Sequence, residues 1–352
     1  TPAYRAGIKS GDLIFKLDDT PVKGLTLNEA VKKMRGKPKT ALKVSILRKG
    51  EAKPIELTLI REVIKVQSVK SKLVEPGYGW VRITQFQENT IPELAKHLST
   101  LYKDGKLQGL VLDLRNDPGG LLNGASGVSA AFLPADVKVV STDGRTEDAK
   151  QEFRARPQDY LRGNKEDPLK TIPAEVKKVA MVVLVNGGSA SASEIVAGAL
   201  QDHKRAIIVG TQTFGKGSVQ SVLPLPGNTA IKLTTARYYT PEGRSIQAKG
   251  IVPDIVAEET LNGNGAVNRL READLDRHLM NDKEKETVKE APKPEAKLPV
   301  KTPAKPGKEK NGKEEAEEEM PQRLEYATKS DYQFQQALNL LKGLQIMQNK
   351  AK

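Results

Sequence analysis

Two apolar runs, joined by a glycine turn and a helix-like stretch, constrain this chain more than any other feature. Residues 179–185 are apolar throughout and end at an Asn-Gly-Gly turn, residues 186–188. A helix-like stretch begins at Glu194, and a second apolar run spans residues 206–209. Near-continuous apolar runs of this length are typical of strands buried on both faces of a sheet. The pattern therefore predicts strand, tight turn, helix and strand, an α/β arrangement.

Three serines alternate just ahead of the predicted helix, at Ser189, Ser191 and Ser193. The unpaired N–H groups of a first helical turn can stabilise the negative charge of a tetrahedral intermediate. A serine placed there can be a nucleophile if a base removes its proton. A Gly/Ser-rich loop without chemistry is the alternative, and the residues alone leave it open.

The candidate bases are three histidines and one lysine. His203 lies 12 residues after Ser191 on the same predicted helix, about 18 Å away at 1.5 Å per residue, which excludes it. His97 lies on an ordinary amphipathic helix, and His278 lies beyond the globular part. Lys216, held between two glycines, remains. As a base it would have to be neutral, which requires burial to lower its pKa; otherwise it is one of many surface lysines.

Residues 1–65 predict short strands and one helix, and they carry a specific pattern. Ala3-x-x-Ala6-Gly7-Ile8-x-x-Gly11-Asp12-Leu13-Ile14, with the helix and hairpin after it, resembles a PDZ domain. The first strand and the carboxylate-binding loop of such a domain would lie upstream, so we expect a truncated PDZ domain. PDZ domains bind peptide carboxyl termini as an added strand. The resemblance implies a groove lined by Leu27, Val31 and Met34, although each also suits a core position facing the sheet.

The remaining segments predict the organisation of the chain. An apolar strand over residues 107–114 ends in an Asp-Pro-Gly-Gly turn. Residues 141–172 are polar with little periodicity, and we expect them to be an exposed insertion near a cleft. Residues 261–281 are expected to be a helical extension. Lys, Glu, Pro and Ala dominate residues 282–321, which predicts a disordered linker.

Order is expected to return within residues 322–352. A capping box of Ser330 and Gln333 precedes an apolar stripe, formed by Phe334, Ala337, Leu338, Leu341 and Leu344. We expect an amphipathic helix that docks on this chain or on another copy, with self-association the preferred interpretation.

Four motifs together resemble the carboxyl-terminal processing (tail-specific) serine protease family. They are LVLDLRNDPGGLL, NGGSASASEIVAGAL, GTQTFGKGSVQ and ARYYTPEGRSIQAKGIVPD, and the resemblance covers residues 1–258. It implies an α/β (α+β) protease core with a mixed sheet, residues 66–260, between the PDZ domain and the C-terminal segments. It also implies a serine endopeptidase that cleaves proteins near their C-termini without a metal or other cofactor.

The resemblance also assigns roles to residues. It implies that Ser191 is the nucleophile, Lys216 the general base and Gln220 the residue that orients the lysine. The oxyanion hole would combine the N–H of Ala192 with a glycine of the turn, Gly119 in preference to Gly120. An auxiliary role is implied for Asp202, which otherwise ends the helix.

Family members are typically exported, so a periplasmic or cell-envelope location, a homo-oligomer and an adaptor protein are further expectations. A non-catalytic binding protein, or a PDZ scaffold on the same core, is the alternative function.

Composition removes several other classes of function. The chain has no cysteine, which excludes disulfides and thiolate chemistry. No apolar run approaches the roughly 20 residues of a membrane span. The formal net charge is +13, of which residues 1–65 contribute +8 from 15 basic and seven acidic residues. With aromatic residues sparse and no recognised motif, nucleic acid is not expected as a partner. The basic region is either a solvated face or a surface that attracts acidic partners.

Overall fold

The computed structural model describes residues 1–9, 11–64, 67–103, 105–163, 166–227, 229–259, 270–276, 278–281 and 325–350. The chain divides into two compact units, Thr1–Gln67 and Ser68–Lys352. The predicted fold class is confirmed: a mixed α/β core follows a PDZ region and carries a C-terminal helix. The predicted linker, 282–321, lies outside the described residues.

The first unit is a small antiparallel sheet with one main helix. Its strands, in the order β2-β1-β3-β4, are Leu13–Leu17 (β1), Thr20–Pro21 (β2), Ala41–Leu47 (β3) and Ile55–Ile60 (β4). Its helices are Pro2–Arg5 (α1) and Leu27–Met34 (α2). Thr26 and Glu29 form a capping box at the start of α2, which explains where that helix begins.

The three predicted groove residues differ in exposure. Leu27 is 78% exposed at the start of α2, and the helix residue that is fully buried is Ala30. Val31 is half-buried, and Met34 packs against the core of this unit. Leu27 is therefore not a core residue, and the groove stays a prediction.

The second unit is built on a six-stranded sheet in the order β14-β11-β10-β7-β6-β5. All neighbours are parallel except β5 and β6. The strands are Val69–Glu75 (β5), Tyr78–Ile83 (β6), Gly109–Asp113 (β7), Ala180–Val185 (β10), Ile207–Gly210 (β11) and Ile255–Val256 (β14). The two apolar runs are β10 and β11, and the apolar strand predicted over residues 107–114 is β7. Because β7 and β10 are parallel neighbours, their carboxyl ends meet at one edge of the sheet.

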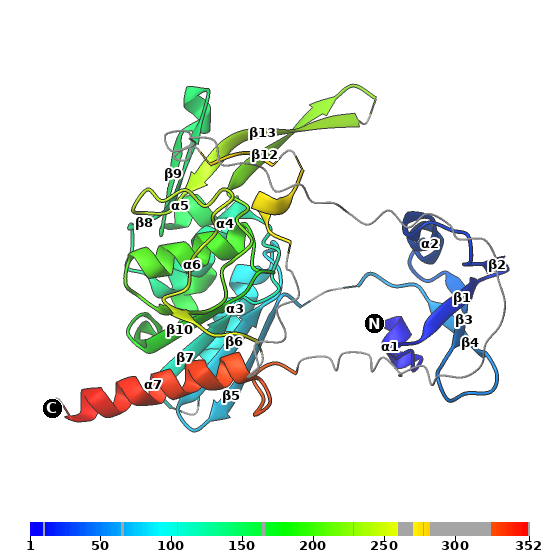
Figure 1. Ribbon diagram of the computed structural model, residues 1–352, viewed down its shortest axis with the longest axis horizontal. Coiled ribbons are helices and arrows are strands. Elements are labelled where there is room, and N and C mark those ends of the chain that lie inside the picture. Colours follow the sequence, from blue (N-terminus) through cyan, green and yellow to red (C-terminus); the bar gives the residue numbers. More distant parts are fainter. Residues whose placement is uncertain are drawn as a thin grey trace, which may run out of the picture. The chain divides into compact units, whose positions relative to one another are not determined.

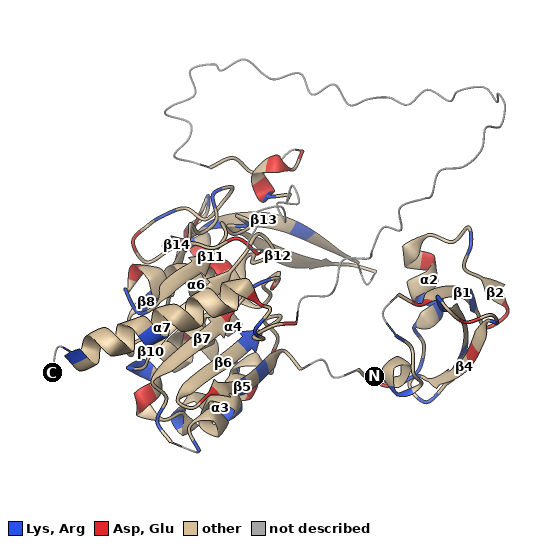
Figure 2. Ribbon diagram, turned by 60° about the horizontal axis from the view of Figure 1, so that its bottom comes forward, with Lys and Arg blue, Asp and Glu red and all other residues tan. Residues whose placement is uncertain are grey.

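Helices cover both faces of this sheet (Figure 1). The helices Thr90–Leu101 (α3), Leu122–Phe132 (α4) and Ala192–Asp202 (α6) share one apolar core with the strands. The C-terminal helix Tyr332–Lys350 (α7) packs on the opposite face, against β7, β10 and β11. Figure 2 shows α7 lying across these strands.

A second sheet, in the order β12-β13-β8-β9, adjoins this core. Its strands are Lys138–Gly144 (β8), Gln151–Arg154 (β9), Ser218–Leu225 (β12) and Thr229–Tyr239 (β13). The ends of β12 and β13 form a ribbon that projects from the unit (Figure 1). The segment 141–172, expected to be an exposed insertion, belongs in part to this sheet, because β8 pairs with β13 and β9. The residues of β8 and β13 that pair are more than 90 positions apart, so local periodicity cannot reveal this pairing.

Short helices complete the unit. One α-helix spans Pro157–Tyr160 (α5), and 3-10 helices span Glu147–Ala149, Pro168–Thr171, Ala174–Lys177 and Glu272–Asp274. The sequence predicts a helical extension over residues 261–281. Of this range the structure describes residues 270–276 and 278–281, and only Glu272–Asp274 is helical there, so the prediction is wrong for these residues. Long-range hydrogen bonds join these described residues to the rest of the unit: the Glu272 N–H donates to Phe214 O, and Asn281 Nδ2 donates to Gln247 O.

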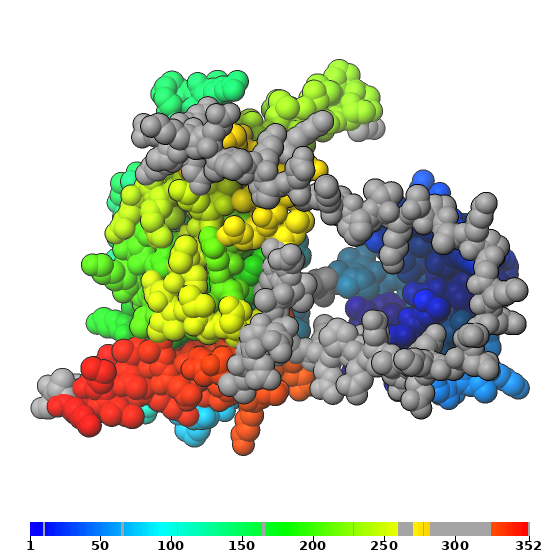
Figure 3. All heavy atoms as spheres, viewed as in Figure 1, coloured from blue at the N-terminus to red at the C-terminus, as the bar shows by residue number. Residues whose placement is uncertain are grey.

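The C-terminal helix docks on its own chain. Asp331 caps it by accepting the Phe334 N–H at 3.2 Å, one residue after the predicted cap at Ser330. The apolar stripe is buried in the same chain, so the preferred interpretation of that stripe as a self-association surface is wrong. Figure 3 shows the red helix in close contact with the body of the unit. Of its large apolar residues, Ile346 and Met347 are left exposed. None of the described helices is long and apolar enough to cross a membrane.

Candidate active site

The turn between β10 and α6 places Ser191 in a strained backbone conformation. Ser191 has φ 56° and ψ −112°, immediately ahead of the first residue of α6, Ala192. A residue with a Cβ atom rarely adopts positive φ, and such strain concentrates at functional sites. The hydroxyl of Ser191 thus lies at the start of a helix, where N–H groups lack intrahelical partners.

Hydrogen bonding distinguishes the three serines. Ser189 and Ser193 are buried, and their hydroxyls donate to Leu114 O at 2.8 Å and Asp117 O at 3.0 Å. Ser191 is half-buried, and its hydroxyl donates to no group within the described residues. The hydroxyls of Ser189 and Ser193 therefore bond the turn between β10 and α6 to the residues that follow β7. The hydroxyl proton of Ser191 is free of such a bond among the described residues. This geometry supports Ser191 as the nucleophile.

Lys216 lies in the loop between β11 and β12, against residues 246–250. A Cβ atom at Gly217 would lie 2.2 Å from Gln247 N, and one at Gly215 would lie 3.1 Å from Ala248 C. The two glycines are needed for this close approach. Lys216 is half-buried, and its amine forms no hydrogen bond or ion pair with any described residue, Ser191 included.

Gln220 lies two residues into β12, and its side chain is exposed. Across the described part of the chain, no hydrogen bond joins it to Lys216. The structure thus brings Ser191 and Lys216 into one region, but among the described residues no series of hydrogen bonds connects Ser191 through Lys216 to Gln220. The roles of Lys216 and Gln220 stay predictions.

Glu194, which the sequence interpretation missed, joins the serine turn to the lysine loop. This buried carboxylate accepts the N–H groups of Ser191 at 2.7 Å, Gly215 at 2.6 Å and Lys216 at 2.9 Å. It also accepts the Thr213 hydroxyl at 2.5 Å. Burial raises the pKa of Glu194 to about 7, although all four of these donors lower it. The Ser-x-x-Glu spacing of a capping box was the available signal.

The turn after β7 packs directly on Ser191. A Cβ atom at Gly119 would lie 2.7 Å from Ala192 N and 2.9 Å from Ser191 Cβ. The N–H of Gly119, however, donates to Asp117 Oδ1 at 2.8 Å. The N–H groups of Gly120 and Ala192 have no acceptor within the described residues. Because the Gly119 N–H is already bonded, this geometry favours Gly120 over Gly119 as the second oxyanion donor beside Ala192, and the assignment stays a prediction.

Side-chain amides fix the two turns to each other. Asn116 N–H donates to Asn186 Oδ1 at 2.9 Å, and Asn186 Nδ2 donates to Asn116 Oδ1 at 3.1 Å. Ala190 N–H donates to Asp117 O at 3.0 Å. These bonds set the position of the glycine turn relative to Ser191.

A buried charge cluster lies on the other side of the strand end. Arg115 contacts Asp113 at 2.7 Å and also Asp331, ahead of α7, at 2.7 Å. Arg82 contacts Asp113 at 3.0 Å and stacks over the Tyr326 ring at 3.6 Å. Burial alone would raise the pKa of Asp113, but Arg115 and Arg82 outweigh it and hold that pKa below its usual value. The C-terminal segment is thus bonded to the residues that precede the glycine turn.

Asp202 does not belong to this site. It lies at the last residue of α6, 11 residues after Ser191, which is about 16 Å along the helix. It accepts the Glu242 N–H at 2.8 Å and pairs with Arg244. Asp202 therefore joins the end of α6 to the turn after β13, and the implied auxiliary role in catalysis is not supported. His203, next along the chain, contacts Lys138 O instead of the site.

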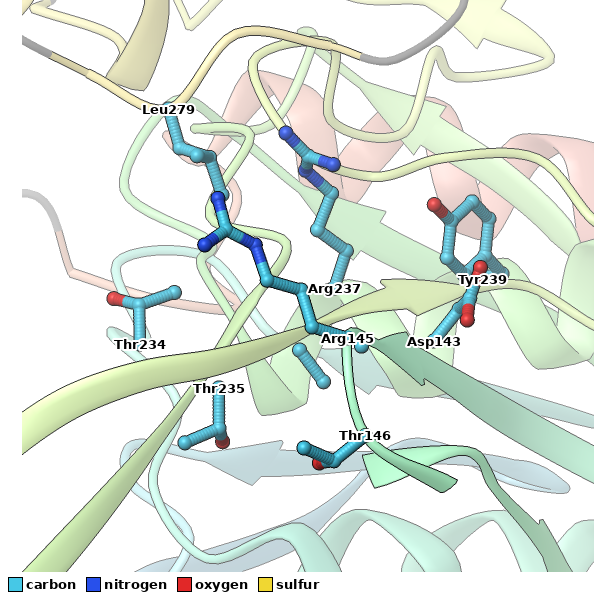
Figure 4. A pocket seen from close by; sticks show the side chains of 10 residues that line it. Asp143, Arg145, Thr146, Thr234, Thr235, Arg237, Tyr239 and Leu279 are labelled. Atoms are coloured by element: carbon cyan, nitrogen blue, oxygen red, sulfur yellow. The ribbon is translucent and has the colours of Figure 1, made fainter. Parts of the chain in front are cut away.

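A pocket of about 620 Å³ lies between β8 and β13, away from these residues. In Figure 4, Arg145 extends toward Leu279, while the side chain of Arg237 extends in a different direction. Neither Ser191 nor Lys216 lines it, so it is not part of the candidate active site. No group of three acidic or histidine side chains placed to hold a metal occurs in the described ranges.

Comparison with known proteins identifies related chains. Residues 77–257 match the model of peptidase family S41, and residues 1–59 match a PDZ domain. A carboxy-terminal-processing protease of Bartonella bacilliformis is 46% identical over 289 residues, which are 81% of this chain and 63% of the relative. A carboxyl-terminal-processing protease of Synechocystis is 38% identical over 74% of this chain and 58% of its own length. The chain thus spans about three fifths of these relatives.

One solved structure supports the fold. A protein from Bacteroides fragilis, assigned to the S41 proteases, superposes with a TM-score of 0.51 at 18% identity. The match covers 74% of this chain and 69% of that protein.

Proposed function

We propose, from the premise that this chain belongs to peptidase family S41, that it is a serine endopeptidase which cleaves proteins near their C-termini. One observation carries the proposal. Of three alternating serines, Ser191 alone has a hydroxyl that donates to no described residue. It lies on a strained turn beside the N–H groups of Ala192 and Gly120, which have no acceptor in the same part of the chain. Those groups suit a developing oxyanion, which preorganised donors stabilise.

The reaction proceeds through an acyl-enzyme. Ser191 Oγ attacks the scissile carbonyl carbon while the neutral amine of Lys216 takes its proton, and the carbonyl oxygen becomes an oxyanion facing Ala192 and Gly120. Collapse of this intermediate breaks the C–N bond, and Lys216 returns the proton to the leaving amine. Water, deprotonated by Lys216, then attacks the acyl carbon. The bond between that carbon and Ser191 Oγ breaks, Lys216 returns the proton to Oγ, and the second product leaves as a carboxylic acid.

Glu194 limits how Lys216 can reach Ser191. Because this carboxylate holds the backbone N–H of both residues, the two backbones keep a fixed separation. The amine therefore approaches Ser191 by rotation of the lysine side chain, and Gln220 would orient it there.

Partners and location follow from the resemblance. The PDZ region is proposed to bind the C-termini of substrates. Homo-oligomerisation, an adaptor protein and a periplasmic or cell-envelope location are proposed for the same reason. Ile346 and Met347 are the exposed large apolar residues of α7, and they could contact another copy.

The test compares cleavage of an unfolded substrate by wild type, Ser191→Ala, Lys216→Ala and Lys232→Ala. Lys232 is an exposed lysine of β13 and serves as the matched control. We expect activity to fall by at least about 10³-fold in the first two variants and to stay unchanged in the third. Equal activity in all four would contradict the proposed pair.

A non-catalytic binding protein is the second candidate, favoured by the missing hydrogen bond between Lys216 and Ser191. Mass spectrometry of the incubated substrate separates the two. Intact substrate that co-elutes with wild type supports binding alone, whereas C-terminal fragments support the protease.

A further inference from the structure

The carboxyl group of Asp117 lies inside the turn that is proposed to supply the oxyanion hole. Its Oδ1 accepts the Gly119 N–H at 2.8 Å. Its main-chain oxygen accepts the Ala190 N–H and the Ser193 hydroxyl, each at 3.0 Å. Asp117 therefore touches the glycine turn through its side chain and the serine turn through its backbone.

The second oxygen of this carboxyl group has no partner. Oδ2 of Asp117 is buried without a hydrogen bond among the described residues, and it is the one carboxylate oxygen with this property there. The residue as a whole is 0% exposed. Burying a carboxylate anion without a compensating partner costs much free energy. The buried carboxyl group of Asp117 is therefore expected to keep its proton.

We propose that Asp117 is a positioning residue of the oxyanion hole, and that its carboxyl must be uncharged when the tetrahedral intermediate forms. The inference rests on the proposed function. By occupying the Gly119 N–H, the side chain leaves the next N–H, of Gly120, to face the oxyanion. A negative charge on Asp117, two residues before Gly119 in the same turn, would repel the charge that develops on the substrate oxygen.

The charged groups around Asp117 do not neutralise it. Arg82, from β6, is the cation that acts on it, but its guanidinium bonds to Asp113 and to Arg115 O. Glu194, from α6, is turned to Ser191 and the lysine loop. Burial raises the pKa of Asp117 to about 7, against the opposing effects of Gly119, Ser193 and Arg82. The carboxyl group of Asp117 therefore loses its proton as the pH rises through about 7.

The experiment measures kcat/KM against pH for wild type and Asp117→Asn. The amide keeps an oxygen to accept the Gly119 N–H but cannot become charged. Both proteins carry the same groups apart from residue 117, so the ratio of the two rates isolates Asp117. We expect a ratio near one at pH 6 that rises to about ten or more at pH 9. A ratio that does not change with pH would overturn the inference.

Two further variants separate position from charge. Asp117→Ala removes the acceptor of the Gly119 N–H and should lower kcat by about 10²-fold at every pH with little effect on KM. Asp136→Asn, which removes a well-exposed carboxylate (64% of that side chain), should keep the wild-type pH profile. If Asp117→Asn is as inactive as Asp117→Ala, the charge is required and the inference is wrong.

An infrared difference spectrum between wild type and Asp117→Asn supplies a readout that needs no turnover. A protonated carboxyl band present at pH 6 and lost by pH 9 is expected in wild type. Its absence at pH 6 would overturn the inference. Failure of the proposed function appears differently, as cleavage that survives Ser191→Ala.

Discussion

The loop that follows the carboxyl end of β7 has two sides, and buried charge is compensated on one side but not on the other. On the side that faces the C-terminal segment, Asp113, Arg115 and Asp331 form a compensated cluster completed by Arg82. On the side that faces Ser191, Asp117 has an unpaired oxygen and Ser191 has positive φ. The two aspartates are four residues apart, yet the pKa of one is lowered and that of the other is raised.

This difference shows where stability and reactivity are placed. The compensated side holds the chain together across 216 residues of sequence, from Arg115 to Asp331. The uncompensated side keeps strain and an unpaired polar atom next to the nucleophile, as active sites commonly do. Removing a charge on the first side should therefore destabilise the fold, whereas removing the buried charge or the backbone strain on the second side should stabilise it while reducing or reshaping activity.

The largest effect is expected from Asp331→Ala. It removes the carboxylate that accepts two hydrogen bonds from the buried guanidinium of Arg115. Breaking a buried pair from one side costs about 3–5 kcal/mol, because a charge is left uncompensated. Urea unfolding should show this loss. Glu75→Ala is the matched control, since it removes an exposed ion pair between the core and Lys342 of α7 and should cost less than about 1 kcal/mol.

On the opposite side, Asp117→Asn should stabilise the fold at alkaline pH. The pKa of Asp117 rises from 3.8 to about 7 on folding, so its proton stabilises the native state below about pH 4. That contribution is lost as pH rises through about 7. The variant escapes this loss and should exceed wild type by about 2–4 kcal/mol at pH 9, with no such gain at pH 4. Urea midpoints at the two pH values check it, and an equal difference at both would contradict it.

Sequence patterns were sufficient to predict the strands and the turn that lie on the two sides of this comparison. Apolar runs predicted β7 and β10, and alternating small residues predicted the turn that carries Ser191, because strand burial and glycine turns are local properties. The Ser-x-x-Glu spacing contained the capping interaction of Glu194, although the bonds of this carboxylate to Gly215 and Lys216 required the fold.

The remaining part depends on contacts between distant residues. The choice of Gly120 over Gly119 follows from the side chain of Asp117, which accepts the N–H two residues on, a habit of aspartate in turns. The pairing of Arg115 with Asp331 joins segments that no local pattern connects. The C-terminal stripe indicated an amphipathic helix but could not indicate which surface would cover it.

A smaller effect separates the serines. Ser193→Ala removes a hydroxyl that donates to Asp117 O in a buried site, which should cost about 1–2 kcal/mol. Ser191→Ala removes a hydroxyl that donates to no described residue, so it should change stability by less than about 0.5 kcal/mol while abolishing cleavage. Thermal unfolding and the cleavage assay, run together, measure both. If Ser193→Ala alone abolished cleavage and Ser191→Ala alone were destabilising, the assignment of the serines would be reversed.

The smallest effect tests the strain itself, by comparing Ser191→Gly with Ser191→Ala. Neither variant has the hydroxyl, so the difference between them reports the backbone at φ 56°. At an ordinary position glycine is less stable than alanine by about 0.5–1 kcal/mol, because it loses more conformational freedom on folding. At Ser191 the sign should reverse, with glycine more stable by about 0.5–1 kcal/mol, because alanine retains the strain. The same pair of substitutions at Ser99, within α3, should show the ordinary sign. Equal signs at the two positions would mean that the turn is unstrained, and that reactivity at Ser191 comes from its uncommitted proton alone.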